Sequence, residues 1–180
     1  MAEQKNIIWE HAGVAGLALG GVSILYLVLS MLIGKLAEGD GGSMLLSLLN
    51  IVLWLVKFSG CIFLMRFFML RYAQADPEAD NARVFRFGTR TALLSALLYA
   101  GFYLAYTTYL APDLFQDAMS MLEDFPMLDS NSREQMDAML PKMPTISFFV
   151  TLIYCWLFGT ILSAFLSRNI PPRNPFTDQQ

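Results

Sequence analysis

The chain has 180 residues and a net charge of −3 at pH 7, and 56% of its residues are hydrophobic while 15% are charged. Soluble domains average about 45–50% apolar and about 25% charged residues, so this composition excludes an ordinary soluble domain and indicates an integral membrane protein. An isoelectric point of about 5.0 also excludes the basic face that a nucleic-acid partner would require.

Four long apolar runs divide the chain. The hydrocarbon core of a bilayer is about 30 Å thick, and about 20 residues of α-helix cross it. The runs lack the alternating pattern of a membrane β-barrel, and the first lacks the basic start and cleavage site of a signal peptide. The sequence therefore predicts one all-α membrane domain over residues 1–180, with transmembrane helices at about residues 12–34, 44–70, 91–110 and 146–167.

Small residues recur at every fourth position on three of these predicted helices. Helices in a bilayer associate by close packing of such residues, because lipid tails are as apolar as leucine. We expect the stripes to pack helices within one chain, and a homodimer contact is the alternative. The stripes are Ala12, Gly16 and Gly20; Ala92, Ala96 and Ala100; and Cys155, Gly159, Ser163 and Ser167.

Basic residues gather on one side of the predicted bundle. The N-terminus, the connection between the second and third helices and the C-terminal tail together hold eight Lys and Arg residues, while the other side holds three. Lys and Arg accumulate on the cytoplasmic side of membrane proteins. We therefore expect both termini to be cytoplasmic and residues 111–145 to be extracytoplasmic.

Lys57 is a charged residue near the middle of a predicted span. A charge there costs at least about 2.5–3.5 kcal/mol, and none of the four spans contains an Asp or Glu residue to pair with it. Asn50 lies two turns earlier on the same helical face, so Lys57 and Asn50 form a candidate intramembrane polar site. We predict that Lys57 faces the helix bundle, and snorkelling toward the interface is the alternative.

The connection between the second and third helices contains two acidic residues, Asp76 and Asp80. Two carboxylates four residues apart lie on one face of a helix and could hold Mg²⁺ together with a phosphorylated substrate. We favour a structural role, in which Asp76 is a helix N-cap and Pro77 occupies the first helical position.

Arg83, Arg86 and Arg90 follow at helical spacing and form a basic stripe at the membrane surface. We expect this stripe to fix the topology and to contact lipid headgroups. A docking site for an anionic lipid-linked substrate is the alternative.

The acidic segment between the third and fourth helices contains two amphipathic stretches. One follows Pro112, which suits the first turn of a helix. Ser132 and Gln135 have the spacing of a capping box and predict a second short helix, which Pro141 and Pro144 end. Helices that lie on a membrane usually carry Lys and Arg, whereas these carry Asp and Glu. We therefore expect a short extracytoplasmic helical cap that packs on the bundle or on a partner.

The remaining reactive residues do not form a catalytic or cofactor-binding set, and we expect no cofactor. His11 is the single histidine, and Cys61 and Cys155 lie on different predicted helices, where we interpret them as small apolar fillers. Six of the eleven methionines lie between Met119 and Met143. Thioethers can bind Cu(I), but we interpret these residues as the apolar faces of the cap helices.

The second half of the chain resembles a known family. Its features are Phe-Arg-Phe-Gly at 85–88, Pro-Asp-Leu-Phe at 112–115, and Ser-Arg-Asn-Ile-Pro-Pro at 167–172. In this order they resemble the four-span bacterial membrane proteins grouped as domain of unknown function 4199 (DUF4199). The resemblance implies an inner-membrane protein of a Gram-negative bacterium and supplies no activity.

Two functional hypotheses follow for a protein without a catalytic set. The sequence favours a non-enzymatic accessory or scaffold subunit that binds a larger envelope-assembly enzyme. The alternative is a small carrier or flippase-like transporter that uses the polar site around Lys57. Transporters often contain internal repeats and broken helices, and the sequence shows neither a repeat nor a proline inside a span.

Overall fold

The computed structural model describes residues 2–39, 44–76, 79–123, 135 and 138–170. Over these residues the protein is all-helical, and four of its helices are long and apolar enough to cross a membrane. The predicted four-span, all-α fold is confirmed. The elements are α1 (Ala2–Gly39), α2 (Met44–Ala75), α3 (Asn81–Ala105), the π-helical turn η1 (Tyr106–Leu110), α4 (Leu114–Glu123), the 3₁₀ turn η2 (Leu140–Lys142) and α6 (Met143–Arg168).

The long helices extend beyond the predicted spans, which covered only the apolar runs, into the polar residues that flank them. This extension corrects one detail of the predicted cap. Pro144 was expected to end a cap helix, but it lies in the first turn of α6, where the N–H that proline lacks would have no helical partner. Of the predicted capping box, Gln135 is helical and Ser132 lies outside the described residues.

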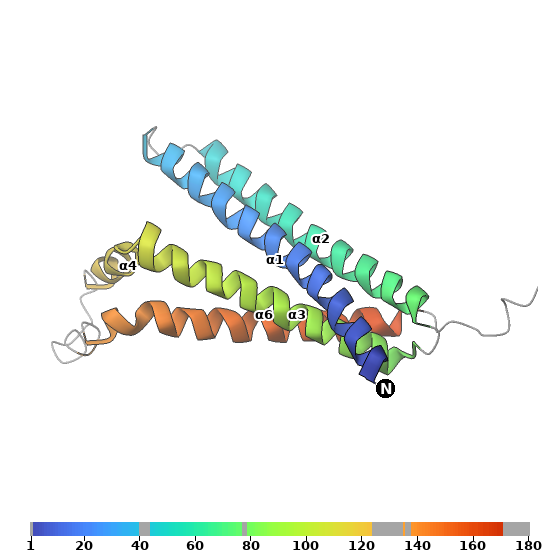
Figure 1. Ribbon diagram of the computed structural model, residues 1–180. Coiled ribbons are helices and arrows are strands. Elements are labelled where there is room, and N and C mark those ends of the chain that lie inside the picture. The colour runs from blue at the N-terminus through green and yellow to red at the C-terminus, as the bar shows by residue number, and fades with distance from the viewer. Residues whose placement is uncertain (1, 40–43, 77–78, 124–134, 136–137, 171–180) are drawn as a thin grey trace, which may run out of the picture.

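Helix α3 is the centre of the arrangement. It packs along α1 on one side and along α6 on the other, whereas α2 packs mainly on α1 and touches α3 and α6 over short stretches. The α1–α2 pair and the α3–α6 pair meet at the end that holds the N-terminus and diverge toward α4 (Figure 1). We call these two ends of the molecule the terminal end and the loop end.

The small residues that were predicted to pack helices do so within the chain. A Cβ atom added to Gly16 of α1 would lie 2.8 Å from the Cβ of Leu94, and one added to Gly159 of α6 would lie 2.5 Å from the Cβ of Ala92. The Ser163 hydroxyl of α6 also donates a hydrogen bond to the Phe85 carbonyl oxygen at 3.1 Å. Both partners of α3 therefore approach its backbone closely.

Large buried side chains concentrate at the terminal end. The Tyr72 ring of α2 stacks on the Phe87 ring of α3, with centroids 4.5 Å apart and an angle of 2° between the planes. Met65 and Met69 of α2 and Val84 of α3 complete this buried cluster. The cluster joins the two helix pairs where they meet.

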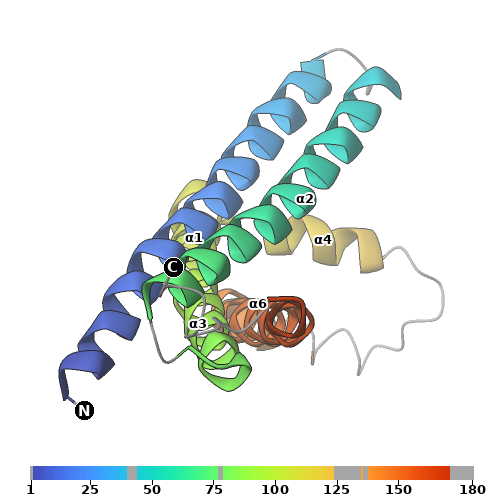
Figure 2. The ribbon, with the colours of Figure 1, turned by 90° about the vertical axis from the view of Figure 1, so that its right-hand side faces the viewer.

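Helix α4 lies at the loop end, in the predicted position of the first cap helix. It runs crosswise to α3 and α6 (Figure 2). Pro112 and Asp113 were expected in the first turn of this helix, but they form a turn that precedes it, because α4 begins at Leu114. Most of the remaining acidic segment lies outside the described residues, and so do two of its methionines, Met127 and Met136.

Candidate functional site

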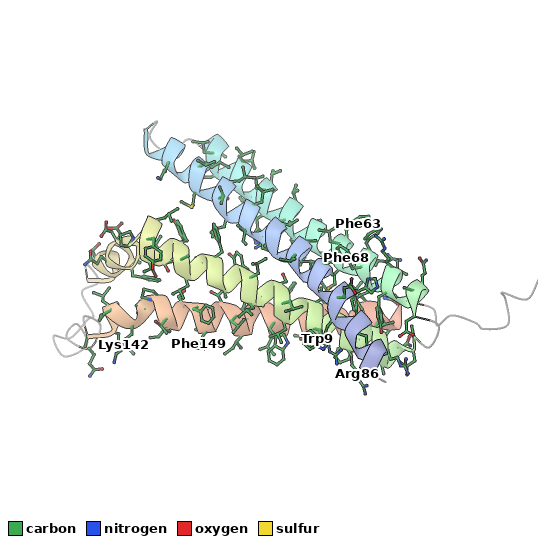
Figure 3. The ribbon with its side chains drawn as sticks, in the orientation of Figure 1. Trp9, Phe63, Phe68, Arg86, Lys142 and Phe149 are labelled. Atoms are coloured by element: carbon green, nitrogen blue, oxygen red, sulfur yellow. The ribbon has the colours of Figure 1, made fainter. Side chains whose placement is uncertain are left out.

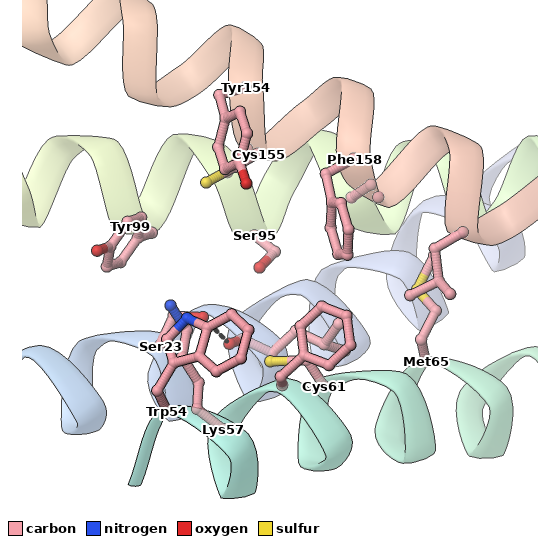
Figure 4. Close-up of a pocket in the computed structure, with 16 residues that line it drawn as sticks. Ser23, Trp54, Lys57, Cys61, Met65, Ser95, Tyr99, Tyr154, Cys155 and Phe158 are labelled. Atoms are coloured by element: carbon pink, nitrogen blue, oxygen red, sulfur yellow. Dashed lines mark hydrogen bonds between the residues drawn. The ribbon is translucent and has the colours of Figure 1, made fainter. Parts of the chain in front are cut away.

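A cleft of about 210 Å³ lies between the two helix pairs, and all four long helices contribute to its walls. Its position is the natural result of two helix pairs that meet at one end and diverge. Figure 4 shows Lys57 and Trp54 on α2 opposite Tyr99 of α3 and Tyr154 of α6. The polar or aromatic lining residues are Ser23, Trp54, Lys57, Phe58, Cys61, Ser95, Tyr99, Tyr154, Cys155 and Phe158.

The Lys57 ammonium lies against two aromatic rings from opposite helix pairs. Its Nζ atom lies 4.8 Å from the centre of the Tyr26 ring on α1 and 5.2 Å from the centre of the Tyr99 ring on α3. An ammonium over the face of such a ring is attracted by the ring quadrupole, by about 2 kcal/mol when the pair is desolvated. The sequence predicts that Lys57 faces the bundle, and the structure places it there.

Lys57 is the one charged side chain among the described residues that line the cleft. The nearby polar groups are neutral. The Ser23 hydroxyl already donates to the Leu19 carbonyl oxygen at 3.1 Å, and Ser95 contributes a second hydroxyl from α3. The rings reduce the cost of this partly buried charge without neutralising it, so the described lining residues carry one positive charge.

The second residue of the predicted polar site, Asn50, has a different partner. Its side-chain oxygen accepts a hydrogen bond from the Ser30 hydroxyl at 3.2 Å, which joins α2 to α1 closer to the loop end. Seven residues of helix separate it from Lys57 by about 10 Å along the axis. Asn50 is not among the residues that line the cleft, so the structure does not bring the two together in one pocket.

Tyr26, Tyr99 and Tyr154 are the site residues that sequence reasoning missed. Tyrosine in membrane proteins is enriched at the two interfaces, where its hydroxyl reaches water. These three tyrosines lie well inside the apolar spans. Their depth in the spans could have pointed to them, because a phenol hydroxyl that is far from the interface favours a polar or cationic neighbour.

Cys61 of α2 and Cys155 of α6 lie on opposite walls of the cleft (Figure 4). Both thiols are free, and both side chains are partly exposed to the cavity. They were expected to be apolar fillers. The structure adds that both are part of the cleft lining.

The predicted basic stripe divides into three separate environments. Arg83 forms an ion pair with Asp76 at 3.6 Å. The Arg90 guanidinium lies 5.0 Å from the centre of the Trp9 ring on α1, and Arg86 is exposed at the terminal end (Figure 3). The three arginines therefore differ in their partners and exposure, and their contact with headgroups stays a prediction.

The two aspartates of the α2–α3 connection also have separate roles, and the prediction that Asp76 caps the helix is wrong. Asp80 is the N-cap of α3, with φ −96° and ψ 169°, and its carboxylate accepts a hydrogen bond from the Arg83 N–H at 2.7 Å. An N-cap must directly precede the first helical turn, and α3 begins at Asn81. Asp76 instead follows α2 and accepts a hydrogen bond from the Tyr72 hydroxyl at 2.9 Å.

Fold and site together define a four-span helical membrane protein with a cationic cleft between two helix pairs. A family model described as protein of unknown function (DUF4199) matches residues 15–168. The chain belongs to this family, which confirms the resemblance noted in the sequence. Comparison with curated proteins and with solved structures gave no match.

Proposed function

We propose that this protein is a small membrane carrier that binds a lipid with a singly negative phosphodiester headgroup at Lys57. The observation that carries the proposal is the position of the Lys57 ammonium, held in a cleft between four helices with no carboxylate among the described lining residues. A charged group inside a transmembrane bundle is by default part of a functional site.

The charge of the site selects the ligand class. One ammonium supplies one positive charge and three hydrogen-bond donors, which match a headgroup with one negative charge. A diphosphate would bring more negative charge than the described lining residues can balance. A neutral lipid would leave the ammonium without a counter-ion.

The walls of the cleft favour a lipid over a free anion. Trp54 of α2 is 50% exposed and Tyr154 of α6 is 68% exposed, and both line the cleft. The cavity therefore reaches the lipid-facing surface between α2 and α6, two helices that touch only sparsely. A headgroup can enter sideways through this opening while its acyl chains stay in the bilayer.

The experiment that tests this proposal is lipid movement in proteoliposomes. Vesicles with the purified protein contain fluorescent NBD-labelled phosphatidylglycerol, and dithionite reduces the label wherever it is exposed to the outer solution. We expect the wild-type protein to move phosphatidylglycerol between leaflets faster than it moves labelled phosphatidylcholine. Lys57→Met should reduce this movement at least tenfold, and Lys57→Arg should retain it.

The matched control is Lys142→Met, which removes the same charge from an exposed position at the loop end. It should move phosphatidylglycerol like the wild type. Equal rates for the wild type and Lys57→Met would overturn the carrier proposal.

An accessory subunit of a larger envelope-assembly enzyme is the second candidate. It is supported by α2, whose outward face is a continuous apolar surface on which Val52 is 47% and Val56 is 62% exposed. Lipid or a partner helix could cover this face. Val56→Trp should disturb a packed partner helix but not a lipid contact, so loss of cellular function by Val56→Trp, with Lys57→Met unaffected, would favour the accessory role.

We also propose that the protein lies in the inner membrane of a bacterium with both termini in the cytoplasm. The orientation is supported by the distribution of Lys and Arg, of which eight lie on the side of the termini and three on the other. In this orientation the Lys57 cleft widens toward the extracytoplasmic side.

A further inference from the structure

A second cavity, of about 240 Å³, lies at the terminal end between α1, α2 and α3. We call it the terminal hollow. Its walls include Glu10 and His11 of α1 and Arg71 of α2, and all three side chains are exposed. Its apolar base includes the stacked rings of Tyr72 and Phe87. It is separate from the Lys57 cleft and shares no lining residue with it.

Opposite charges line this hollow without neutralising each other. Within the described chain, neither Glu10 nor Arg71 takes part in an ion pair. A carboxylate and a guanidinium on the two sides of one cavity can each bind an opposite charge of a ligand. The arrangement therefore suits a zwitterion, with its negative group toward Arg71 and its positive group toward Glu10.

Arg90 lies near the hollow but is not one of its lining residues. Its Nη1 atom is buried and has no hydrogen-bond partner among the described residues. The guanidinium is held over the Trp9 ring and interacts electrostatically with Tyr72, a lining residue.

The depth and size of the hollow fit a lipid headgroup. Glu10 lies near the start of the apolar part of α1, and Arg71 near the end of the apolar part of α2. Trp9 beside them is typical of the membrane interface. The volume of about 240 Å³ is large enough for several water-sized groups and can therefore accommodate a phosphoethanolamine group, which has eight non-hydrogen atoms.

We propose that the terminal hollow binds the headgroup of phosphatidylethanolamine, with the phosphate at Arg71 and the ammonium at Glu10. An ethanolamine ammonium has N–H donors for a carboxylate, whereas the quaternary ammonium of phosphatidylcholine has none. Phosphatidylethanolamine and phosphatidylcholine carry the same net charge, so a preference between them does not depend on Lys57 or on the carrier proposal.

Native mass spectrometry of the purified protein tests this inference. The protein, in mild detergent, is mixed with equal amounts of phosphatidylethanolamine and phosphatidylcholine that have the same acyl chains. The wild type should retain phosphatidylethanolamine about tenfold better. Glu10→Gln should abolish the preference and Glu10→Asp should retain part of it, while Arg71→Gln should weaken the binding of both lipids.

Two control variants remove the same charges elsewhere. Asp113→Asn lies at the loop end, and Arg66→Gln lies on α2 outside the hollow; both should keep the preference for phosphatidylethanolamine. Free phosphoethanolamine should not displace the bound lipid at equal concentration, because it lacks the acyl chains. Equal retention of the two lipids by the wild type, or an unchanged preference in Glu10→Gln, would overturn the inference.

Discussion

The Lys57 ammonium of α2 lies 5.2 Å from the centre of the Tyr99 ring of α3, and this contact spans the cleft between the two helix pairs. The same ammonium contacts the Tyr26 ring of its own helix pair at 4.8 Å. Helix α2 touches α3 over only a short stretch, whereas α1 packs along α3. The Lys57–Tyr99 contact is therefore part of what joins α2 to α3, while the packing of α1 on α3 joins the two helix pairs. An anion bound at Lys57 would compete with the rings, and ligand binding would therefore loosen the contact between α2 and α3.

The first prediction concerns the ring of Tyr99. Tyr99→Leu removes the aromatic face and should lower the stability of the folded bundle by about 0.5–2 kcal/mol. Tyr99→Phe keeps the ring and should retain most of that stability. Thermal unfolding of the purified variants in detergent measures the difference, and a Phe variant as unstable as the Leu variant would show that the hydroxyl, not the ring, matters.

The second prediction concerns the contact of α6 with α3 at Gly159. Gly159→Ala places a methyl group 2.5 Å from the Cβ of Ala92, and the resulting overpacking should cost about 1–3 kcal/mol. Gly101→Ala on α3 is the control, because a Cβ atom there meets nothing within 4 Å. Helix propensity should leave Gly101→Ala as stable as the wild type or more stable. Equal melting temperatures for the two variants would contradict the close approach of α6 to α3.

The third prediction concerns the start of α3. Asp80→Ala removes the acceptor of the 2.7 Å hydrogen bond from the Arg83 N–H and should cost about 1 kcal/mol. Asp80→Ser restores an N-cap acceptor and should recover most of that loss. Both variants are compared with the wild type by thermal unfolding. A Ser variant no better than the Ala variant would argue that Asp80 acts through its charge.

The fourth prediction concerns membrane orientation. Alkaline phosphatase, which is active only outside the cytoplasm, should be active when fused after residue 112 and inactive when fused after residue 180. The reason is the excess of Lys and Arg on the side of the termini. Activity in the reverse pattern would invert the proposed topology and place the wide side of the cleft in the cytoplasm.

The four spans could be predicted from the sequence because bilayer thickness sets a minimum length for every apolar run. The energetic cost of Lys57 likewise predicted that its side chain turns inward. Both inferences depend on one residue or one run at a time. They therefore do not require knowledge of which helices are neighbours.

The partners of Lys57 could not be predicted, because they depend on which helices are neighbours. Tyr26 and Tyr99 lie on different helices, and their proximity depends on how the two helix pairs diverge. Asn50 shares a helical face with Lys57, but its side-chain oxygen accepts a hydrogen bond from the Ser30 hydroxyl of α1. It therefore pairs with α1 and not with Lys57. The N-cap at Asp80 was missed because two aspartates offered the same short-range signal, and only the actual start of α3 distinguishes them.

The most direct test of the central claim is the affinity of the Lys57 cleft for an anionic lipid. Trp54 lines the cleft, so energy transfer from tryptophan to an NBD-labelled phosphatidylglycerol reports binding in detergent. The wild type should bind this lipid at least tenfold more tightly than NBD-labelled phosphatidylcholine, Lys57→Met should bind both equally, and Lys57→Arg should keep the preference. A wild-type protein that binds the two lipids with equal affinity would contradict the account.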